Sequence, residues 1–558
     1  MSRKKGGRPC RGRLQERSSW WIIAVGHPAV CGGRKPASRR PVQGGPGSPA
    51  VPPWAGRARG GAAASRLTRG GGTRMPKVSR ETMNAVNRRE FLKWSAAGAA
   101  ALALPRWLAA AEGVAAGKPN IIFILFDDLG YGEPPTFRKD SPLKMPNLDR
   151  LAQEGVRFTD AHCAAAVCTP TRYGVLTGRY PFRIGQFGVL NFNSKPIIEK
   201  QRMTVASMLK ARGYHTACFG KWHLGMNWGD VKAEAAAKAA APVADGPTTR
   251  GFDVFCGYTE ARSIRTVIEN DRVLGTFEPV EVQPLMARKA AEYIGDRAKD
   301  RKPFFLYQPL SIPHVPHVPA KEFEGKSGQG VYGDWIFEGD WVVGQILGAL
   351  QRSGLAENTL IIASSDNGAE GREYPPLRGS KRSIYEGGHR EPFVARWPGK
   401  IRPGTVCEDT VCLNGLLATC AEIVGEKLPD GAGEDSVSFL PHLLGAAKGP
   451  VREATVHQSS AGDLAIRQGP WKLIFFKSGK RELYNLKDDL SETRDVLAAN
   501  PDEVERLAKL MQQYIDNGRS TPGAPQKNGI GFALPKPVAG GAGEEGGEGG
   551  ARKRKKAG

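Results

Sequence analysis

Carboxylate and amide side chains follow two apolar runs that have the length of buried strands. Asp127 and Asp128 follow the run IIFILF, and Asp366 and Asn367 follow LIIASS. Each pair alone is an ordinary turn signal. Taken together, they supply the oxygen ligands that Ca²⁺ and Mg²⁺ prefer, whereas zinc and copper sites draw mainly on nitrogen and sulfur. The four residues therefore predict a site for a hard divalent cation.

Basic residues and histidines fall near the same strand ends. Lys221 and His223 follow one predicted strand, His314 follows another, and Arg172 and Lys381 stand in polar segments. Cationic side chains around a metal ion form an anion site, and histidines can move protons. A metal that polarises one oxygen, cations that neutralise the others and a histidine that protonates a leaving alcohol describe hydrolysis of a phosphate or sulfate ester.

Such a hydrolysis needs a nucleophile, and Cys168 is the candidate. It lies in the stretch AVCTPTRYGVLTGRYPFR (166–183), two residues before Pro170 and four before Arg172. A zinc site would need a second ligand nearby, which CxxC spacing supplies and this stretch lacks. The surroundings of Cys168 therefore favour a chemical role for this cysteine.

These motifs resemble those of the type I sulfatases, which are formylglycine-dependent enzymes of the arylsulfatase family in the alkaline phosphatase superfamily. CTPTR (168–172) with TGR (177–179) resembles the family's C-x-P-S/T-R-x4-T-G-R signature. Four further segments resemble its other motifs in the same order: GKWHLG (220–225), PHVPH (313–317), SSDNG (364–368) and KRSIYEGGHREPF (381–393). The resemblance covers about residues 118–518.

The resemblance implies a sulfuric ester hydrolase whose signature cysteine is oxidised by a formylglycine-generating enzyme. Cys168 would become the aldehyde, and its hydrate would be both the nucleophile and a metal ligand. The other ligands of Ca²⁺, or alternatively Mg²⁺, would be Asp127, Asp128, Asp366 and Asn367. A sulfated carbohydrate is the expected substrate of such an exported enzyme, ahead of a small sulfate ester.

The same resemblance implies a role for each remaining catalytic candidate. Arg172 would steady the aldehyde hydrate, and Lys221 and Lys381 would bind sulfate oxygens. His314 would donate a proton to the leaving alcohol. His223 would be the base that eliminates sulfate. Asp366 would also take the proton of the nucleophile.

From residue 118 the chain alternates strand-like and helix-like segments, which predicts an α/β fold. We expect a catalytic domain at 112–445 with a large central mixed, mostly parallel sheet flanked by helices, alkaline phosphatase-like by resemblance. Ligands of open α/β sheets bind beyond the carboxyl ends of the strands, so the polar clusters can converge there. Antiparallel strands at 463–486 and a helix capped by Asn500 predict a smaller C-terminal α+β domain at 446–535.

The formal charge of +24 is concentrated at the N-terminus. Residues 1–111 hold 22 of the 80 Lys and Arg but only 3 of the 56 Asp and Glu, so the remainder carries only +5. A nearly neutral body argues against a nucleic-acid partner. Residues 1–82 are expected to be disordered, or to be upstream sequence from too early a start codon, and residues 536–558 to be a disordered tail.

Residues 83–111 have the anatomy of a cleaved export signal. Arg88 and Arg89 precede an eleven-residue apolar stretch, 94–104, and small residues follow at 109–111. The paired arginines resemble the twin-arginine class. A membrane anchor would want about 20 apolar residues, so none is expected. We therefore predict a periplasmic or secreted bacterial protein that is exported after folding.

Two other functions stay open from the sequence. Relatives with the same cysteine chemistry cleave phosphate diesters or phosphonate monoesters, and the pocket that would discriminate them is not visible in a sequence. A protein of another class, an inactive sulfoglycan-binding protein with unmodified Cys168, is the second alternative. Its weakness is that the acid, base and metal residues are all intact.

Overall fold

The computed structural model describes residues 117–228, 242–300 and 302–537. The predicted extension (1–82), the predicted signal (83–111) and all but the first two residues of the predicted tail (536–558) lie outside the described residues. No helix in the described part of the chain has the length and apolarity needed to cross a membrane.

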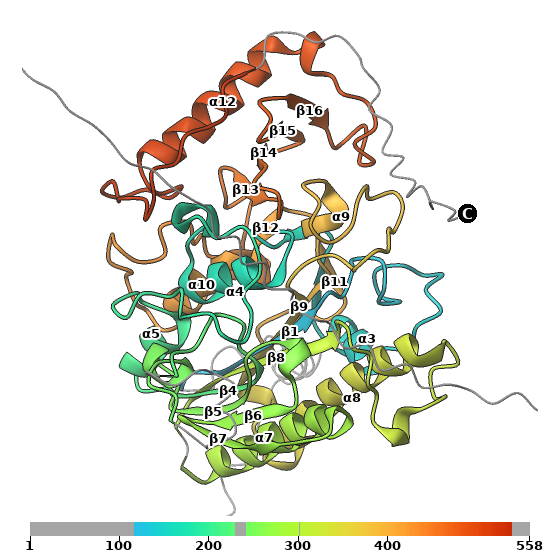
Figure 1. Ribbon diagram of the computed structural model, residues 1–558. Coiled ribbons are helices and arrows are strands. Elements are labelled where there is room, and N and C mark those ends of the chain that lie inside the picture. The colour runs from blue at the N-terminus through green and yellow to red at the C-terminus, as the bar shows by residue number, and fades with distance from the viewer. Residues whose placement is uncertain (1–116, 229–241, 301, 538–558) are drawn as a thin grey trace, which may run out of the picture. The chain divides into compact units, whose positions relative to one another are not determined.

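The central sheet has ten strands in the order β11-β2-β10-β9-β1-β8-β4-β5-β6-β7 (Figure 1). Strands β9, β1, β8, β4 and β5 are parallel, whereas β10 and β6 run antiparallel to their neighbours. The predicted mixed, mostly parallel sheet is confirmed. The strands are β1 (Asn120–Asp127), β2 (Val156–Phe158), β4 (His215–Lys221), β5 (Val254–Tyr258), β6 (Thr266–Glu269), β7 (Arg272–Thr276), β8 (Phe304–Pro313), β9 (Thr359–Ser365), β10 (Phe393–Arg396) and β11 (Thr405–Cys407).

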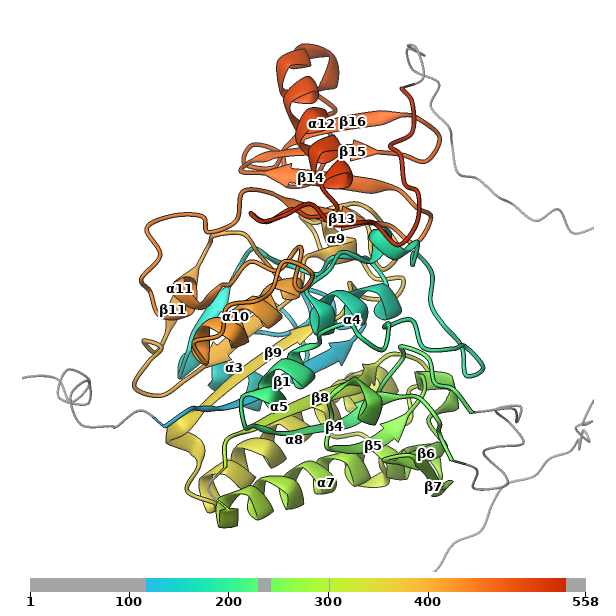
Figure 2. The ribbon, with the colours of Figure 1, turned by 90° about the vertical axis from the view of Figure 1, so that its left-hand side faces the viewer.

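Helices cover both faces of this sheet (Figure 2). Successive side chains of a strand point to opposite faces, so Ile121 and Phe123 of β1 enter one core while Ile122 and Ile124 enter another. This explains why β1 is apolar throughout rather than alternating. The first core contains α4 (Cys168–Thr177), α5 (Val205–Ala211) and α10 (Leu416–Ile423), and the second contains α3 (Pro146–Gln153), α7 (Pro279–Asp300) and α8 (Gly330–Arg352).

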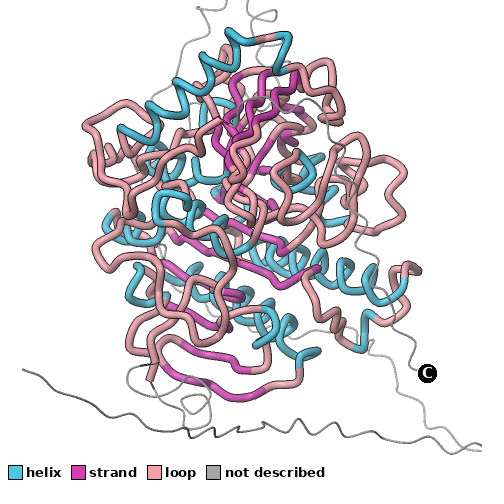
Figure 3. The backbone as a smooth tube through the Cα atoms, turned by 45° about the horizontal axis from the view of Figure 1, so that its top comes forward, coloured by secondary structure: helices cyan, strands magenta, loops and turns pink. Residues whose placement is uncertain are grey.

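A four-stranded antiparallel sheet follows toward the C-terminus, with α12 (Pro501–Asp516) packed against it (Figure 3). Leu507, Met511 and Tyr514 form the buried stripe of α12. Asn500 occupies the N-cap position as predicted, but its side chain does not cap the helix, because its amide donates to the carbonyl of Val496 instead. The strands are β13 (Thr455–Gln458), β14 (Leu464–Gln468), β15 (Trp471–Phe475) and β16 (Arg481–Asn485).

Short elements connect these parts. Strands β3 (Ala161–His162) and β12 (Val411–Cys412) form a two-stranded parallel sheet, and α9 (Glu386–His389) and α11 (Leu440–Leu443) are single turns of helix. The predicted domain limits at 445 and 535 stay predictions.

Candidate active site

Four neighbouring strands, β9, β1, β8 and β4, end at the same edge of the central sheet (Figure 1). Asp127 is the last residue of β1 and Lys221 the last of β4, while His314 and Asp366 come directly after β8 and β9. Because these strands are parallel, side chains from distant parts of the sequence meet at one edge. The structure brings them together as the sequence predicted.

Helix α4 supplies the nucleophile candidate. Cys168 is its first residue, and Arg172 lies one turn further along the same face. Arg172 donates from Nε and Nη2 to Asp366 Oδ2, at 2.9 and 2.6 Å, and from Nη1 to the carbonyl oxygen of Lys221 at 3.2 Å. These bonds tie the start of α4 to the ends of β9 and β4, which fixes Cys168 relative to the carboxylates.

The carboxylates of Asp127, Asp128 and Asp366 and the sulfur of Cys168 form one cluster, with one atom from each within 4.8 Å of the others. Asn367 joins them by donating from Nδ2 to Asp128 Oδ1 at 2.7 Å. Oδ1 of Asp127 and Oδ1 of Asn367 are buried and have no hydrogen-bond partner among the described residues. Buried oxygens without a donor are costly. This donor set fits a hard divalent cation.

Two buried lysines lie against the cluster. Lys221 Nζ donates to Asp127 Oδ2 and Lys381 Nζ donates to Asp128 Oδ2, each at 2.6 Å. Burial alone would lower the pKa of Lys381, but the carboxylates of Asp128 and Asp127 oppose it and the pKa is raised. Lys381 therefore carries a positive charge although its side chain is almost fully buried, as an anion-binding group requires.

The two carboxylates nearest Arg172 differ in their proton affinity. Burial raises the pKa of Asp366 to about 7 despite the opposing charge of Arg172, and Asp127 adds to the rise. The pKa of Asp127 itself is well below its usual range, because Lys221 and the other cations outweigh burial. Asp366 can thus exchange a proton near neutral pH, whereas Asp127 stays ionised.

His223 is oriented to accept a proton. It follows β4 in the left-handed region with φ 55°, and its Nε2 lies 2.9 Å from the carbonyl oxygen of Leu190. A carbonyl only accepts, so Nε2 carries the hydrogen and Nδ1 carries the lone pair. Nδ1 is buried without a partner among the described residues. Burial, with Lys221 nearby, holds the pKa of His223 well below its usual value, so the ring is neutral.

His314 presents its other ring nitrogen to the cluster. Nδ1 donates to the carbonyl oxygen of Val315 at 2.5 Å, and Nε2 lies 3.9 Å from Asp128 Oδ2. Burial lowers the pKa of His314, and Asp127 opposes this shift. Because its pKa is lowered, a His314 ring that is protonated at Nε2 would release that proton readily. His317, from the same motif, packs against the ring of Tyr332 and does not line the cavity described next.

A cavity of about 230 Å³ gives access to these groups. Cys168, His223, His314 and Lys381 line it. The other lining residues come from five segments: Val167, Gly188 and Val189, Glu260 and Arg262, Arg382, and Ser460. Most of these others are polar or charged, which suits a hydrophilic substrate.

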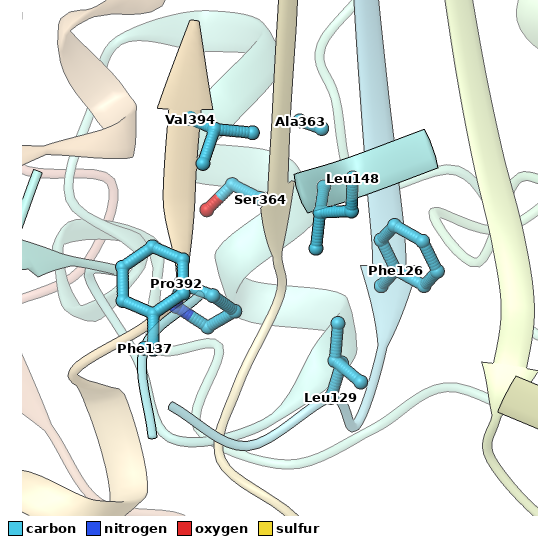
Figure 4. A pocket seen from close by; sticks show the side chains of 8 residues that line it. All are labelled: Phe126, Leu129, Phe137, Leu148, Ala363, Ser364, Pro392 and Val394. Atoms are coloured by element: carbon cyan, nitrogen blue, oxygen red, sulfur yellow. The ribbon is translucent and has the colours of Figure 1, made fainter. Parts of the chain in front are cut away.

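The hollow in Figure 4 is of a different kind. It lies beside the ends of β1 and β9, is almost wholly apolar and is too tightly filled to hold a water molecule. We regard it as part of the packing beneath α3. Its lining residues are Phe126, Leu129, Phe137, Leu148, Ala363, Ser364, Pro392 and Val394.

Sequence motifs missed part of the cavity. Arg382 lies within a recognised segment but was given no role, and Glu260, Arg262 and Ser460 lie outside every motif. The position of Arg382 directly after Lys381 was the one available signal. Nothing in the sequence around Ser460 indicates that the C-terminal part of the chain reaches the cavity.

An oxygen-ligand cation site, a nucleophile candidate and buried lysines at the strand ends of an α/β sheet define a hydrolase of anionic esters. A family model described as Sulfatase matches residues 119–426, and one for the twin-arginine translocation pathway signal sequence matches residues 85–105. The chain belongs to the sulfatase family. It is a sulfuric ester hydrolase with a signal for export after folding, as predicted.

Named relatives agree with this assignment. The chain is 31% identical over 481 residues to an N-acetylgalactosamine-6-O-sulfatase of Bacteroides thetaiotaomicron, covering 71% of this chain and 93% of the relative. It is 35% identical over 435 residues to human arylsulfatase A, covering 70% and 82%. A solved structure from work on the metabolism of multiple glycosaminoglycans by Bacteroides thetaiotaomicron has a TM-score of 0.66 at 29% identity, covering 71% of this chain and 99% of that chain.

Proposed function

We propose that the protein releases sulfate from a sulfated carbohydrate, using formylglycine made from Cys168 and Ca²⁺ held by Asp127, Asp128, Asp366 and Asn367. The observation that carries the proposal is the position of Cys168. Cys168 is the first residue of the buried helix α4, and its sulfur belongs to the oxygen cluster, which includes buried oxygens without a hydrogen-bond partner among the described residues. Two buried lysines and two histidines lie around the same site.

An unmodified thiol suits this reaction poorly. Burial raises the pKa of Cys168, so at neutral pH the side chain is a protonated thiol, whereas the thiolate is the nucleophile. A thiolate that attacked sulfur would also leave a thiosulfate linkage with no built-in route to release sulfate. Formylglycine, as its hydrate, would supply one hydroxyl for attack, whose proton Asp366 would take, and a second hydroxyl whose deprotonation would release sulfate.

The side chains around position 168 supply the remaining steps. Lys221 and Lys381 neutralise sulfate oxygens, and Arg172 orients the residue at position 168. Protonated His314 gives the proton on Nε2 to the leaving alcohol oxygen. His223 then accepts a proton at Nδ1 as sulfate is eliminated. Ca²⁺, or alternatively Mg²⁺, held by the four oxygen ligands would supply Lewis-acid polarisation of the ester.

A glycan substrate is supported by the relatives and by the cavity. The N-acetylgalactosamine-6-O-sulfatase is 31% identical to this chain over 481 residues, and the cavity wall is rich in polar and charged side chains. A phosphodiester or phosphonate monoester presents a similar anionic centre, so it is the competing substrate class. An exported glycan sulfatase also needs a formylglycine-generating enzyme as a partner during maturation.

Mass spectrometry tests the modification directly. Trypsin releases the peptide 158–172, which contains Cys163 and Cys168. We expect one alkylatable thiol, at Cys163, and an aldehyde or its hydrate at position 168. Cys163 serves as the internal reference, since it is buried and has no role in the mechanism. Two intact thiols in a preparation with full turnover would overturn the proposal.

A substrate panel tests the reaction class. Purified protein should release inorganic sulfate from sulfated glycans in the presence of Ca²⁺, and Cys168→Ala should release none. If the protein hydrolysed phosphodiesters with a higher kcat/KM than any sulfate ester, we would assign it as a phosphodiesterase instead. Binding of sulfated glycans with no turnover, by protein in which Cys168 remains an unmodified thiol, would favour the inactive binding protein.

A further inference from the structure

Two arginines line the cavity without a part in the proposed chemistry. Arg262 belongs to the short 3-10 helix η3 (Ala261–Ser263) that follows β5, and Arg382 follows Lys381. Arg262 is exposed, and its guanidinium makes no hydrogen bond or ion pair with any residue that the structure describes. The Arg382 side chain is 52% exposed and pairs with Glu370, which does not line the cavity.

The backbone of Arg382 is held in an unusual conformation. Its φ is 80°, a region that costs least for glycine. The N–H of Arg382 donates to the carbonyl of Ala166 at 2.7 Å, and its own carbonyl accepts from the N–H of Ser460 at 3.2 Å. A strained residue persists where its surroundings fix it, and such residues gather at functional sites. The long side chain therefore starts from a rigid point on the cavity wall.

The acidic residue of the same wall does not neutralise these arginines. Glu260 is nearly buried, and its carboxylate accepts from the N–H of Arg262 at 2.9 Å and from the hydroxyl of Ser263 at 2.6 Å. Its charge is thus directed toward its own loop. The guanidinium of Arg262 is left to bind an anion from solution.

We propose that Arg262 and Arg382 form an anion subsite for a second negative group on the substrate, next to the sulfate ester that is cleaved. This inference rests on the proposed function. The lysines and the metal would already match the charge of the ester sulfate, so the unpaired guanidinium of Arg262 is surplus for a neutral sugar. Arg382 adds a second cation when its exposed side chain exchanges Glu370 for the anion of the substrate. A guanidinium fork binds a carboxylate or sulfate through two parallel hydrogen bonds.

The subsite narrows the substrate class to polyanionic glycans. The second group would be a uronate carboxylate or another sulfate, since both offer paired oxygens to a guanidinium. A cavity of about 230 Å³ lies below the ~300–1,000 Å³ of pockets that enclose drug-sized ligands. It therefore suits one sugar ring with its substituents better than an extended chain.

Steady-state kinetics on Arg262→Gln, Arg382→Gln and the double variant test this. The substrates are 4-methylumbelliferyl sulfate, a monosulfated neutral sugar, a disulfated sugar, and a disaccharide in which a uronate adjoins the sulfated ring. We expect the ratio of kcat/KM between doubly charged and singly charged substrates to fall about 10-fold or more in each variant, through KM. The disulfated and uronate substrates distinguish the two sources of the second anion.

Arg265→Gln is the matched control. Arg265 lies three residues from Arg262, pairs with Glu278 on the surface and does not line the cavity. The substitution Arg265→Gln removes the same charge outside the cavity, so the kcat/KM ratio of doubly to singly charged substrates should equal that of the wild type. An unchanged ratio in the double variant, or an equal fall in the control, would overturn the subsite. A thermal melt of each variant checks that the fold is kept.

Binding without turnover separates this inference from the proposed function. Calorimetry on Cys168→Ala, with and without Arg262→Gln, measures affinity for the doubly charged sugars whether or not any sulfate is released. We expect about 10-fold weaker binding with Arg262→Gln and little change for the monosulfated sugar. Equal affinities would contradict the subsite even if sulfatase activity is present. Failure of sulfate release in the wild type would contradict only the proposed function.

Discussion

The three carboxylates of the oxygen cluster pair with three cationic side chains, of which Arg172 contacts both Asp366 and Asp127, and all six groups are buried. Buried pairs of this kind are sensitive, because removing one partner leaves a charge that nothing compensates, at a cost of about 3–5 kcal/mol. A divalent cation that takes over the carboxylates would free the lysines for an anionic substrate, so metal and substrate binding should be coupled. The pairs are Lys221 with Asp127, Lys381 with Asp128, and Arg172 with Asp366.

The substitution Asp366→Asn tests the proposed metal site. It removes the negative charge of one ligand and leaves Arg172 with the more distant Asp127, 3.5 Å away, as its anion, so Ca²⁺ should no longer raise the melting temperature and the unbound protein should melt lower. Differential scanning calorimetry with and without Ca²⁺ measures both effects. Asp340→Asn is the control, since Asp340 is equally buried but bonds to the start of α3. A wild-type response to Ca²⁺ in Asp366→Asn would remove this residue from the site.

The substitution His314→Ala tests proton transfer to the leaving group. An acidic phenol leaves without help, whereas a sugar alkoxide needs a proton. The loss of kcat/KM should therefore be about 10²–10⁴-fold on a glycan sulfate and much smaller on an activated aryl sulfate. His317→Ala, from the same loop but outside the cavity, is the control. Equal losses on both substrates would indicate a binding or folding defect instead.

At the scale of elements, the site depends on strands that approach each other closely. Gly220, the residue before Lys221 in β4, has φ 134°, and a Cβ built there would lie 1.9 Å from the carbonyl oxygen of Pro309 in β8. Any side chain at this position would force β4 away from β8. The ends of these strands carry Lys221 and His314, so their spacing sets the width of the site.

The substitution Gly220→Ala should therefore be severe. We expect a loss of more than about 3 kcal/mol in the free energy of unfolding, from the clash and the backbone strain together. Gly213→Ala is the matched control, because Gly213 has φ 86° but a Cβ added there would meet nothing within 4 Å. It should lose only about 1–2 kcal/mol, from strain alone. Urea unfolding compares them, and equal losses would contradict the packing argument.

The elements differ in how far the sequence predicts them. Strands β1 and β9 are apolar runs that end in aspartates, so the sequence predicts both the strands and the polar residues at the edge of the sheet. Helix α4 is not, because all ten of its residues are buried and it therefore has no polar face to give an amphipathic pattern. Which lysine pairs with which aspartate is also hidden, since Lys381 and Asp128 are 253 residues apart.

At the scale of the whole molecule, a buried polar network joins the C-terminal sheet to the central domain. Lys472 Nζ of β15 lies 3.1 Å from His389 Nε2, the Nδ1 atoms of His389 and His162 lie 3.1 Å apart, and His162 Nε2 lies 2.8 Å from Asp160 Oδ1. His457 stacks on His389 with ring planes 6° apart, an arrangement in which both rings cannot coordinate one metal ion.

This network should make the protein acid-sensitive. Burial lowers the pKa of His162, His389 and His457 below the value of about 6.5 in an unfolded chain. The folded protein then binds fewer protons than the unfolded chain, so stability decreases as pH falls below about 6.5, by up to about 1.4 kcal/mol per pH unit for each histidine. The charged groups around the rings are Lys472, Arg467, Arg390, Asp160, Glu386 and Glu492.

Urea unfolding between pH 7.5 and 5.0 measures this dependence. His457→Phe keeps the stacked ring but removes one titrating group, so its stability should fall less steeply with decreasing pH than that of the wild type. Subtracting one stability profile from the other isolates the contribution of His457. Buried carboxylates contribute equally to both proteins; burial raises the pKa of Glu338, for example, to about 8, so Glu338 stabilises the fold as pH falls. Parallel pH profiles would show that His457 contributes nothing to the acid sensitivity.

The burial of Cys168 constrains when the enzyme can be made active. The side chain is 1% exposed, and every residue of α4 is buried with it, so a modifying enzyme cannot reach this segment once the helix has packed. If position 168 carries formylglycine as proposed, a molecule that folds before it is oxidised is inactive unless it unfolds again. Because export follows folding, the active fraction outside the cytoplasm would then depend on whether oxidation precedes folding inside it, and adding the modifying enzyme to folded precursor should restore no activity.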